Sequence, residues 1–247
     1  MKFSLITFDI LDSTNTEALK QARLGADEGL CIVARQQTAG RGRYGRTWVS
    51  EPGAGLYFSV ILRPGIGAHD LGLITLMAGV AVHDTLEKFA IAPDIKWVND
   101  VLVNEKKIAG ILAETTETAT GLAVVVGIGI NLHSSSFPPD LVTTATCAED
   151  STPTIVRPEE LIDMLTQHLG RYYEKLQAED GPANIIAAWT RRSSYSSGKI
   201  VRVVMENETV TGTTDGLESN GALRIKRSDG SVAIVQTGDV EQVRAAN

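Results

Sequence analysis

The chain has 247 residues and a net charge of −7, with 43% apolar and 21% charged residues. Its length allows one large domain or a large domain and a small one, and its composition excludes disordered and fibrous proteins. The acidic balance argues against a broad nucleic-acid-binding surface. Two isolated cysteines cannot build a disulfide framework, and no segment has the length of a signal peptide or membrane span. We therefore expect a soluble, cytoplasmic protein without a membrane partner.

The first 192 residues mix strand and helix patterns. Thr14 with Glu17 forms a capping-box pattern that predicts the start of a short helix, and Gly25 can end it. Helices are also expected over residues 71–90, over residues 158–177 and around residues 185–189. Strands are expected over residues 3–8, 30–35, 56–62, 95–98, 101–104, 107–114 and 122–132. The last of these is too uniformly apolar to lie at an exposed sheet edge.

From Ser193 the pattern changes to short alternating strands separated by turn residues. These strands are expected over residues 200–204, 209–213, 222–225 and 232–235. Such spacing is typical of a small β-barrel of about 50 residues. The sequence therefore predicts two domains, residues 1–192 and residues 193–247.

Three arginines, Arg41, Arg43 and Arg46, alternate with three glycines between residues 36 and 48. Glycines let a backbone approach a ligand closely, and arginines donate forked hydrogen bonds to phosphate or carboxylate. A solvated flexible loop and an arginine–glycine contact with nucleic acid are the alternatives. The glycines also fit the dinucleotide-binding spacing, but neither the helix nor the later acidic residue of that motif follows, so we reject it.

Two further segments point to ligand chemistry. Asp100 ends the sequence Lys-Trp-Val-Asn-Asp, and Lys107 follows on the next expected strand. A carboxylate close to a lysine suits a magnesium–phosphate site, although an Asn-Asp pair is as often a simple turn. Gly127 and Gly129 interrupt an apolar strand, which indicates either close approach by a ligand or a bulge.

Five motifs occur together in the order and spacing of one family. They are Ser13-Thr14-Asn15, Gln37 with residues 40–46, Lys96-Trp97-x-Asn99-Asp100, Lys107-x-x-Gly110 and Gly127-x-Gly129-x-Asn131. Over residues 3–189 the chain resembles the bacterial biotin–protein ligases, also called biotin–acetyl-CoA-carboxylase ligases. The C-terminal strands resemble the SH3-like domain of that family. The resemblance implies an α+β fold: a mixed-sheet catalytic domain with helices on one face, followed by a small SH3-like β-barrel.

The resemblance also implies a two-step reaction. Biotin and Mg-ATP would give biotinyl-5′-AMP and pyrophosphate, with Mg²⁺ as the cofactor. A lysine of the biotin carboxyl carrier protein would then attack this mixed anhydride and release AMP. Positioning and electrostatic stabilisation matter more in such chemistry than a general base.

The site residues follow from the same resemblance. Lys107, Arg41 and Arg43 are the implied catalytic residues, and Asp100 is the implied Mg²⁺ ligand. The implied biotin-binding residues are Ser13, Thr14, Asn15, Gln37, Gly40, Arg41, Gly42, Arg43, Tyr57, Lys107, Gly110, Gly127 and Gly129. The implied ATP-binding residues are Arg41, Arg43, Arg46, Trp48, Asn99, Asp100, Lys107 and Asn131.

Two features set this chain apart within the family. Val98 stands where the family pattern has proline, so we expect slightly altered geometry and retained activity. Ser13 lies too near the start to follow the helix-turn-helix of some relatives, so we expect neither a repressor role nor a DNA partner. A homodimer rests on the resemblance alone. The alternative functions are a lipoate–protein ligase and a non-enzymatic nucleic-acid-binding module.

Overall fold

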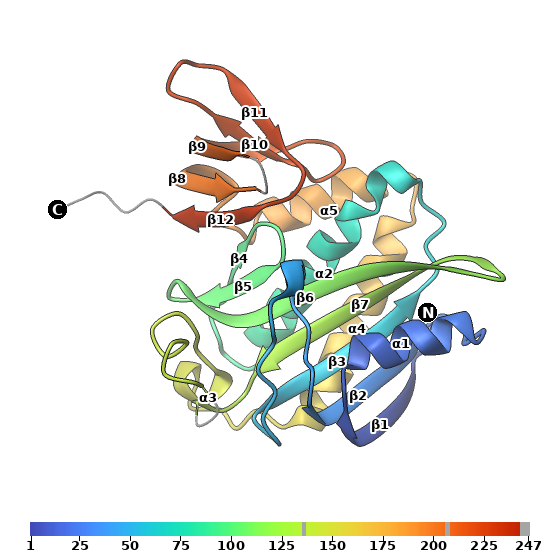
Figure 1. Ribbon diagram of the computed structural model, residues 1–247. Helices are drawn as coiled ribbons and strands as arrows, with labels where there is room; N and C mark the ends of the chain where they lie inside the picture. Colours follow the sequence, from blue (N-terminus) through green and yellow to red (C-terminus); the bar gives the residue numbers. More distant parts are fainter. Residues whose placement is uncertain (135–136, 206–207, 243–247) are drawn as a thin grey trace.

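A computed structural model describes residues 1–134, 137–205 and 208–242. It contains a mixed seven-stranded sheet, in the order β1-β2-β3-β7-β6-β5-β4, and an antiparallel five-stranded sheet, in the order β11-β10-β9-β8-β12 (Figure 1). The first sheet consists of β1 (Ser4–Leu11), β2 (Leu30–Gln37), β3 (Gly55–Leu62), β4 (Asp94–Lys96), β5 (Asp100–Val103), β6 (Lys106–Thr118) and β7 (Gly121–Asn131). The second consists of β8 (Ser197–Val204), β9 (Thr209–Leu217), β10 (Leu223–Lys226), β11 (Val232–Val235) and β12 (Asp239–Gln242).

The helices pack mainly against the seven-stranded sheet. They are α1 (Thr14–Arg23), α2 (Gly72–Glu87), α3 (Ala148–Ser151), α4 (Pro158–Leu176) and α5 (Gly181–Thr190), with the short 3₁₀ turns η1 (Arg43–Gly45) and η2 (Ala68–Asp70). Pro158 stands in the first turn of α4, as its sequence predicts. Within the described residues, no helix is both long and apolar enough to cross a membrane.

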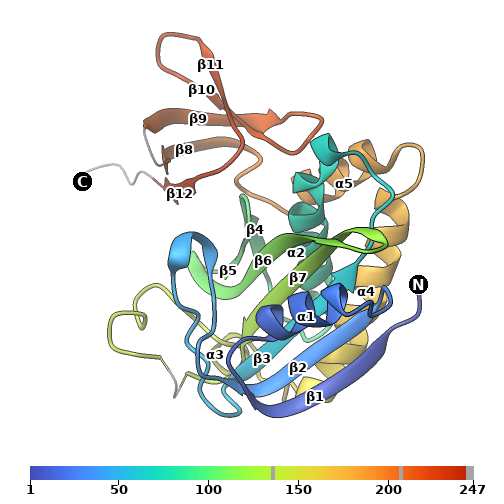
Figure 2. The same cartoon turned by 45° about the vertical axis from the view of Figure 1, so that its right-hand side comes forward.

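Helices cover both faces of this sheet. Figure 2 shows α1 on one side of the strands and α2 and α4 on the other. Ala18 and Ala22 of α1 pack against Val125 of β7, whereas Val124 and Val126 belong to the large core that includes α2 and α4. The α+β class with a mixed sheet is therefore confirmed, but the expectation of helices on one face is wrong for α1. Neighbouring residues of β7 are apolar and point to opposite faces, so both faces need cover.

Strand β7 lies between β3 and β6, which confirms that its continuous apolar run is not an edge. Each expected strand is present, most of them with shifted ends. Strand β6 runs on to Thr118 because β-branched residues continue to pair with β7 up to a turn at Gly121 (φ +106°). Helix α2 ends earlier than its apolar pattern predicts, and Ala90 beyond it adopts φ +58°.

The two sheets are joined by direct contacts. The indole N–H of Trp97, just after β4, donates to the carbonyl of Gly221 at 3.0 Å, and the Ser193 hydroxyl donates to the carbonyl of Ile95 at 2.5 Å. The peptide bond between Trp97 and Val98 is cis. The buried apolar residues of the second sheet belong to the same hydrophobic cluster as α2 and α4. Strand β12, which the sequence pattern did not predict, pairs with β8 and lies at an edge of the second sheet.

Candidate active site

A cavity of about 440 Å³ opens where the segment of residues 41–49 passes over β6 and β7. This volume is in the range of small-molecule sites. The cavity is lined by every site residue that the sequence predicts except Gly40, namely Ser13, Thr14, Asn15, Gln37, Arg41, Gly42, Arg43, Arg46, Trp48, Tyr57, Asn99, Asp100, Lys107, Gly110, Gly127, Gly129 and Asn131.

Gly40, the remaining predicted biotin-site residue, is not among the residues that line the cavity. It is buried at the base of the loop, where its carbonyl accepts a hydrogen bond from the Trp48 N–H at 2.9 Å. A Cβ at this position would lie 2.3 Å from the Trp48 carbonyl oxygen. The glycine is therefore needed for closure of the loop.

One end of the cavity is a cluster of buried polar side chains at the start of α1. Gln37 on β2 accepts hydrogen bonds from the Thr14 N–H and hydroxyl at 2.8 and 3.1 Å. The Asn15 amide donates to the carbonyl of Leu112 at 3.1 Å and to Glu114 at 2.8 Å. Ser59 Oγ lies 2.6 Å from Asn15 Oδ1. These bonds fix the polar groups before any ligand arrives, which lowers the cost of binding.

The predicted capping box at Thr14 is wrong. The N-cap of α1 is Ser13, and no side-chain hydrogen bond caps the helix. Thr14 lies one position inside the helix, so its hydroxyl cannot reach back to the free N–H groups of the first turn and bonds to Gln37 instead. The Ser13-Thr14-Asn15 motif therefore lines the cavity and does not supply a side-chain cap to α1.

Three glycines shape the floor of the cavity. A Cβ at Gly127 would lie 2.1 Å from Asn15 Oδ1, so this glycine makes room for the polar cluster. A Cβ at Gly110 or Gly129 would lie 2.9 or 2.4 Å from the Trp48 indole. The space that the sequence assigns to a ligand is thus partly filled by the protein's own side chains.

Trp48 covers the middle of the cavity. Lys107 Nζ lies 5.3 Å from the centre of its ring, within cation–π range. The indole Nε1 of Trp48 is buried without a hydrogen-bond partner among the described residues. A buried donor left unpaired costs about 1–3 kcal/mol, so a ligand that offers an acceptor here gains affinity.

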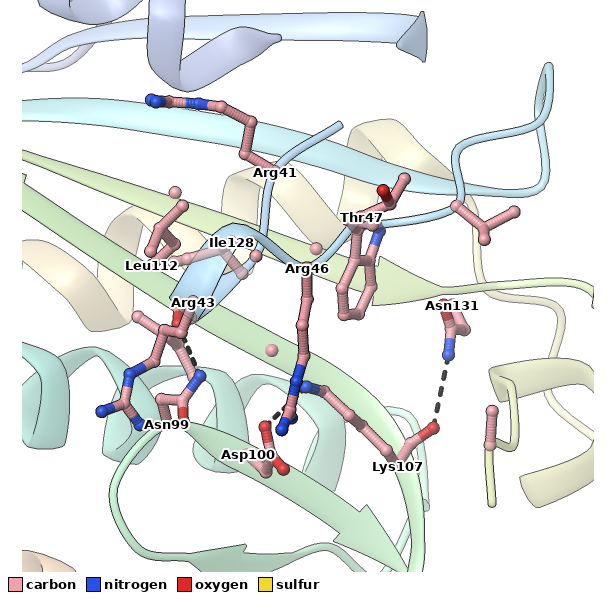
Figure 3. A pocket seen from close by; sticks show the side chains of 18 of the residues that line it. Arg41, Arg43, Arg46, Thr47, Asn99, Asp100, Lys107, Leu112, Ile128 and Asn131 are labelled. Carbon is pink, nitrogen blue, oxygen red and sulfur yellow. Dashed lines mark hydrogen bonds and ion pairs between the residues drawn. The ribbon is translucent and has the colours of Figure 1, made fainter. Parts of the chain in front are cut away.

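The other end of the cavity is cationic and is built around Lys107, the second residue of β6. Its N–H donates to the Thr144 carbonyl at 2.8 Å, while its carbonyl accepts from the Thr146 N–H at 2.9 Å and from the Asn131 amide at 3.3 Å. The Nζ atom forms an ion pair with Asp100 at 2.6 Å (Figure 3). The backbone of Lys107 is therefore held by hydrogen bonds from two segments, residues 144–146 and Asn131 of β7.

Asp100 is surrounded by positive charge. Its carboxylate also faces Lys96, at 3.4 Å. Burial alone would raise the pKa of Asp100, but the charges and hydrogen bonds of Lys107 and Lys96 outweigh it and hold the pKa below the ordinary value. Asp100 thus stays ionised and keeps both ammonium groups at this end of the cavity.

The three loop arginines do not point the same way. Figure 3 shows Arg43 and Arg46 extending toward Asn99, Asp100 and Lys107, whereas Arg41 extends to the opposite side. Arg43 donates to Asn99 Oδ1 at 3.1 Å, and the Asn99 amide donates to the Ile111 carbonyl at 2.9 Å. Arg41 forms an ion pair with Glu114, next to Asn15. The loop therefore supplies cations to both ends of the cavity.

Sequence analysis missed several residues of the site. Ser59 and Glu114 form hydrogen bonds with Asn15 in the polar cluster. Asp239 lines the cavity from the second sheet. Lys96, Glu105, Phe137, Leu141, Thr144 and Ala145 also line the cavity. The alternation of β6 could have indicated Glu114, which shares a face with Leu112. Nothing in the local sequence connects Asp239 to the cavity, whose other lining residues lie between positions 13 and 145.

The match to protein families agrees with this geometry. Residues 7–131 match the biotin/lipoate A/B protein ligase family, and residues 196–242 match the biotin protein ligase C-terminal domain. The first match covers half of the chain. The chain therefore belongs to the biotin/lipoate A/B protein ligase family, and the resemblance seen in its motifs is confirmed.

Individual relatives point in the same direction. The bifunctional ligase/repressor BirA of Bacillus subtilis is 36% identical over 96% of this chain and 73% of its own length. The biotin–[acetyl-CoA-carboxylase] ligase of Paracoccus denitrificans is 36% identical over 90% of this chain and 94% of its own length. The structure of the Aquifex aeolicus biotin protein ligase with biotin and ATP is 28% identical, with a TM-score of 0.85 over 98% of this chain and 99% of its own. The expected enzyme class is confirmed by these relatives.

Proposed function

We propose that this chain activates biotin with Mg-ATP to biotinyl-5′-AMP and transfers the biotinyl group to a lysine of the biotin carboxyl carrier protein of acetyl-CoA carboxylase. The observation that carries the proposal is the cavity, in which a buried polar end and a cationic end face each other across a glycine-lined floor. The Aquifex aeolicus structure contains biotin and ATP, which supports biotin as the acid that this chain activates. The C-terminal match to biotin protein ligases favours biotin over lipoate.

The polar end suits an uncharged ureido ring, and the cationic end suits a carboxylate and a phosphate. Thr14 and Asn15 are buried and Gln37 is partly buried, and their hydrogen bonds hold these donors and acceptors in fixed positions. Lys107 and Arg43 offer donors for oxygen anions at the other end. A carboxylic acid with a polar ring would therefore lie with its carboxylate toward Lys107.

In the first step, a biotin carboxylate oxygen attacks the α-phosphorus of ATP. A C–O–P linkage forms, the bond to the bridging oxygen of the β-phosphate breaks, and pyrophosphate leaves with that electron pair. Two anions must approach each other, so Lys107 lowers the repulsion and stabilises the charge that develops on the phosphoryl oxygens. Asn131 and the segment around Thr144 hold the backbone of Lys107 during this approach.

In the second step, a neutral lysine amine of the carrier protein attacks the carbonyl carbon of the anhydride. The bond between this carbon and the phosphate oxygen breaks, AMP leaves with the electron pair, and the proton of the amine passes to solvent water. The loop over the cavity and Trp48 would shield the anhydride from water until the carrier arrives.

Mg²⁺ would enter with ATP as part of the substrate. Magnesium in proteins takes one or two carboxylates together with substrate phosphates and water, and Asp100 is one such carboxylate at the cationic end. The Asp100 oxygens already face Lys107 and Lys96, so this donor set fits an ion that ATP brings and does not by itself fit a resident one.

Biotin-dependent exchange of pyrophosphate into ATP tests the first step. We expect exchange with biotin and Mg²⁺, and none when lipoate replaces biotin. Transfer of labelled biotin to the carrier protein tests the second step. Exchange driven by lipoate alone would assign the chain to the lipoate branch of the family, and no exchange with either acid would refute the proposed enzyme.

The edge of the seven-stranded sheet supports a homodimer. Strand β1 is the edge strand, and its Leu5, Ile6 and Ile10 side chains are 49%, 40% and 60% exposed. An exposed apolar edge strand is a template for pairing with another chain. We expect light scattering to give about twice the chain mass of 26.5 kDa, and Ile10→Lys to give a monomer. A monomeric wild type would contradict this expectation.

Three further expectations stay proposals. The division into residues 1–192 and 193–247 is supported by the position of β8–β12, which all lie beyond residue 196. A cytoplasmic location is supported by the buried, unpaired thiols of Cys31 and Cys147. We also propose that the chain does not act as a repressor, for which the measurement is operator binding at physiological salt.

A further inference from the structure

Glu114 on β6 joins two parts of the cavity wall. It is not among the residues that line the cavity, but it bonds to Asn15 and Arg41, which are. Its Oε2 atom accepts a hydrogen bond from the Asn15 amide at 2.8 Å, and the same atom forms an ion pair with Arg41. Asn15 belongs to the polar cluster at the start of α1, whereas Arg41 lies on the loop over the cavity. The helix and the loop therefore meet on a single carboxylate oxygen.

Hydrogen bonds fix the direction of the Asn15 amide group. Its Nδ2 atom donates to the Leu112 carbonyl at 3.1 Å and to Glu114 Oε2. A carbonyl and an ionised carboxylate are acceptors only, so the nitrogen must lie on this side. The Oδ1 atom accepts from the Ser59 hydroxyl at 2.6 Å and lies against Gly127, where a Cβ would come within 2.1 Å of it. An amide oxygen has two lone pairs, so it can also accept from an N–H group of a ligand.

Thr14 is directed in a similar way. Gln37 Oε1 accepts hydrogen bonds from both the N–H and the hydroxyl of Thr14, which uses the only hydrogen of that hydroxyl. Thr14 Oγ1 therefore faces the rest of the cluster as an acceptor, and Ser59 Oγ lies 2.8 Å from it. Ser59 has one hydroxyl hydrogen to share between Thr14 and Asn15. Buried acceptors are thus open to the N–H groups of a polar ring.

The sheet holds Glu114 in place. Glu114 pairs with Val125 of β7, on the face that α1 covers. Two residues further along β6, Thr116 Oγ1 accepts a hydrogen bond from Arg23 Nε at 2.9 Å, so this face of the strand is tied to both ends of α1. The Glu114 side chain is 27% exposed and that of Arg41 is 40% exposed. The more buried carboxylate on the sheet is therefore the fixed partner of the loop arginine.

We propose that Glu114 is a positioning residue for biotin: it holds the Asn15 amide with its oxygen toward the ring, and it holds the loop over that ring through Arg41. Groups that are held before binding cost less entropy when the ligand arrives. The inference rests on the proposed function, because the ring is that of biotin. Figure 3 shows Arg41 extending away from Arg43 and Arg46. Loss of Glu114 should therefore weaken biotin binding and leave KM for ATP within about twofold of the wild type.

Calorimetric titration with biotin, in the absence of ATP, separates the two contacts. Glu114→Gln keeps an oxygen that accepts from Asn15 and loses only the charge opposite Arg41. Because that ion pair is partly exposed, we expect the dissociation constant for biotin to rise about threefold. Glu114→Ala also loses the acceptor of a charge-assisted hydrogen bond, so we expect the dissociation constant to rise about tenfold to a hundredfold. A value for Glu114→Ala within about twofold of the wild type would overturn the proposal.

Glu117→Gln is the matched control. Glu117 lies on the same strand, its side chain is exposed, and the substitution removes the same charge. We expect biotin binding within about twofold of the wild type. KM for ATP, taken from exchange kinetics, is the readout that a merely structural role would move. A rise in this KM as large as the loss of biotin affinity in Glu114→Ala would show general damage to the site and overturn the proposal.

A second background tests whether Glu114 acts through Asn15. In a chain that carries Asn15→Ala, no amide remains to be held. The dissociation constants of Glu114→Gln and Glu114→Ala should then agree within about twofold, whereas they should differ severalfold when Asn15 is present. The same difference in both backgrounds would overturn the role of Glu114 at Asn15.

Tryptic cleavage after Arg41 tests the hold on the loop without any ligand. We expect Glu114→Gln to be cut there about threefold faster than the wild type and Glu117→Gln. Equal cleavage rates, or tighter biotin binding by Glu114→Gln, would overturn the role of Glu114 at Arg41. A wild type that binds no biotin would refute the proposed function, and the cleavage rates would still decide whether Glu114 holds the loop.

Discussion

Replacing Lys107 by alanine is expected to slow biotin-dependent ATP–pyrophosphate exchange by about 10²–10³-fold, the usual effect of losing one charge-stabilising donor from an enzyme site. Lys107 Nζ lies at the cationic end of the cavity, and hydrogen bonds to Asn131, Thr144 and Thr146 fix its backbone. Water that replaces the ammonium would not be held in a comparable position. The exchange rate at saturating biotin and ATP is the measurement.

Lys106→Ala is the matched control. Lys106 is the neighbouring residue on β6, and its exposed side chain donates to the Val142 carbonyl at 3.4 Å, away from the cavity. We expect its exchange rate to stay within about twofold of the wild type. A Lys107→Ala rate within about threefold of the wild type would contradict the assigned role.

A second variant separates loss of the ammonium from the effect of an exposed carboxylate. Lys107→Ala leaves Asp100 with Lys96 as its remaining ion-pair partner, so the carboxylate could repel ATP. The double variant Lys107→Ala/Asp100→Asn removes that charge. We expect it to remain as slow as Lys107→Ala, because the missing donor limits the rate. Recovery of the exchange rate in the double variant would show that the charge of Asp100, and not the missing ammonium, slows Lys107→Ala.

Most of the fold could be predicted from local patterns. The apolar run of β7, the periodicity of α2 and the proline at the start of α4 each describe the element in which they lie. Strand β12 could not be predicted, because Asp239–Gln242 has only one apolar residue and its pairing partner β8 lies far away in sequence. The cover of both sheet faces could have been predicted from the neighbouring apolar residues of β7.

The candidate site was predictable where motifs lie on neighbouring strands. Gly110, Gly129 and Lys107 meet because β6 and β7 pair directly. The partners of the arginines were not predictable, because Glu114 and Asp239 reach the loop only through tertiary packing. Local reasoning also misplaced the Thr14 hydroxyl. A threonine hydroxyl at this place can either cap the helix or face the cavity. Because the N-cap is Ser13, one residue earlier than predicted, the Thr14 hydroxyl bonds to Gln37 in the cavity.

Asp84→Asn is expected to lower the free energy of unfolding by about 3 kcal/mol at neutral pH, the usual cost of breaking a buried ion pair. Asp84 on α2 accepts hydrogen bonds from Arg171 and Tyr172 of α4 and from Arg192 beyond α5. Its side chain is only 9% exposed. For a chain of this length the loss lowers Tm by roughly 6–12 °C. Asp163→Asn, on the exposed side of α4, is the control and should leave Tm nearly unchanged.

The same carboxylate makes stability depend on acid pH. Burial would raise the pKa of Asp84, but hydrogen bonds from His83, Arg192 and Tyr172 and the charge of Arg192 hold it well below the ordinary value. A lowered pKa in the folded protein stabilises above the unfolded pKa of about 3.9, and this contribution is lost as pH falls toward the folded value. The difference in unfolding free energy between wild type and Asp84→Asn should therefore be largest at pH 5–7 and shrink below about pH 4. Denaturant titrations at several pH values measure it, and a difference that stays constant down to pH 3 would show that the ionised carboxylate is not its source.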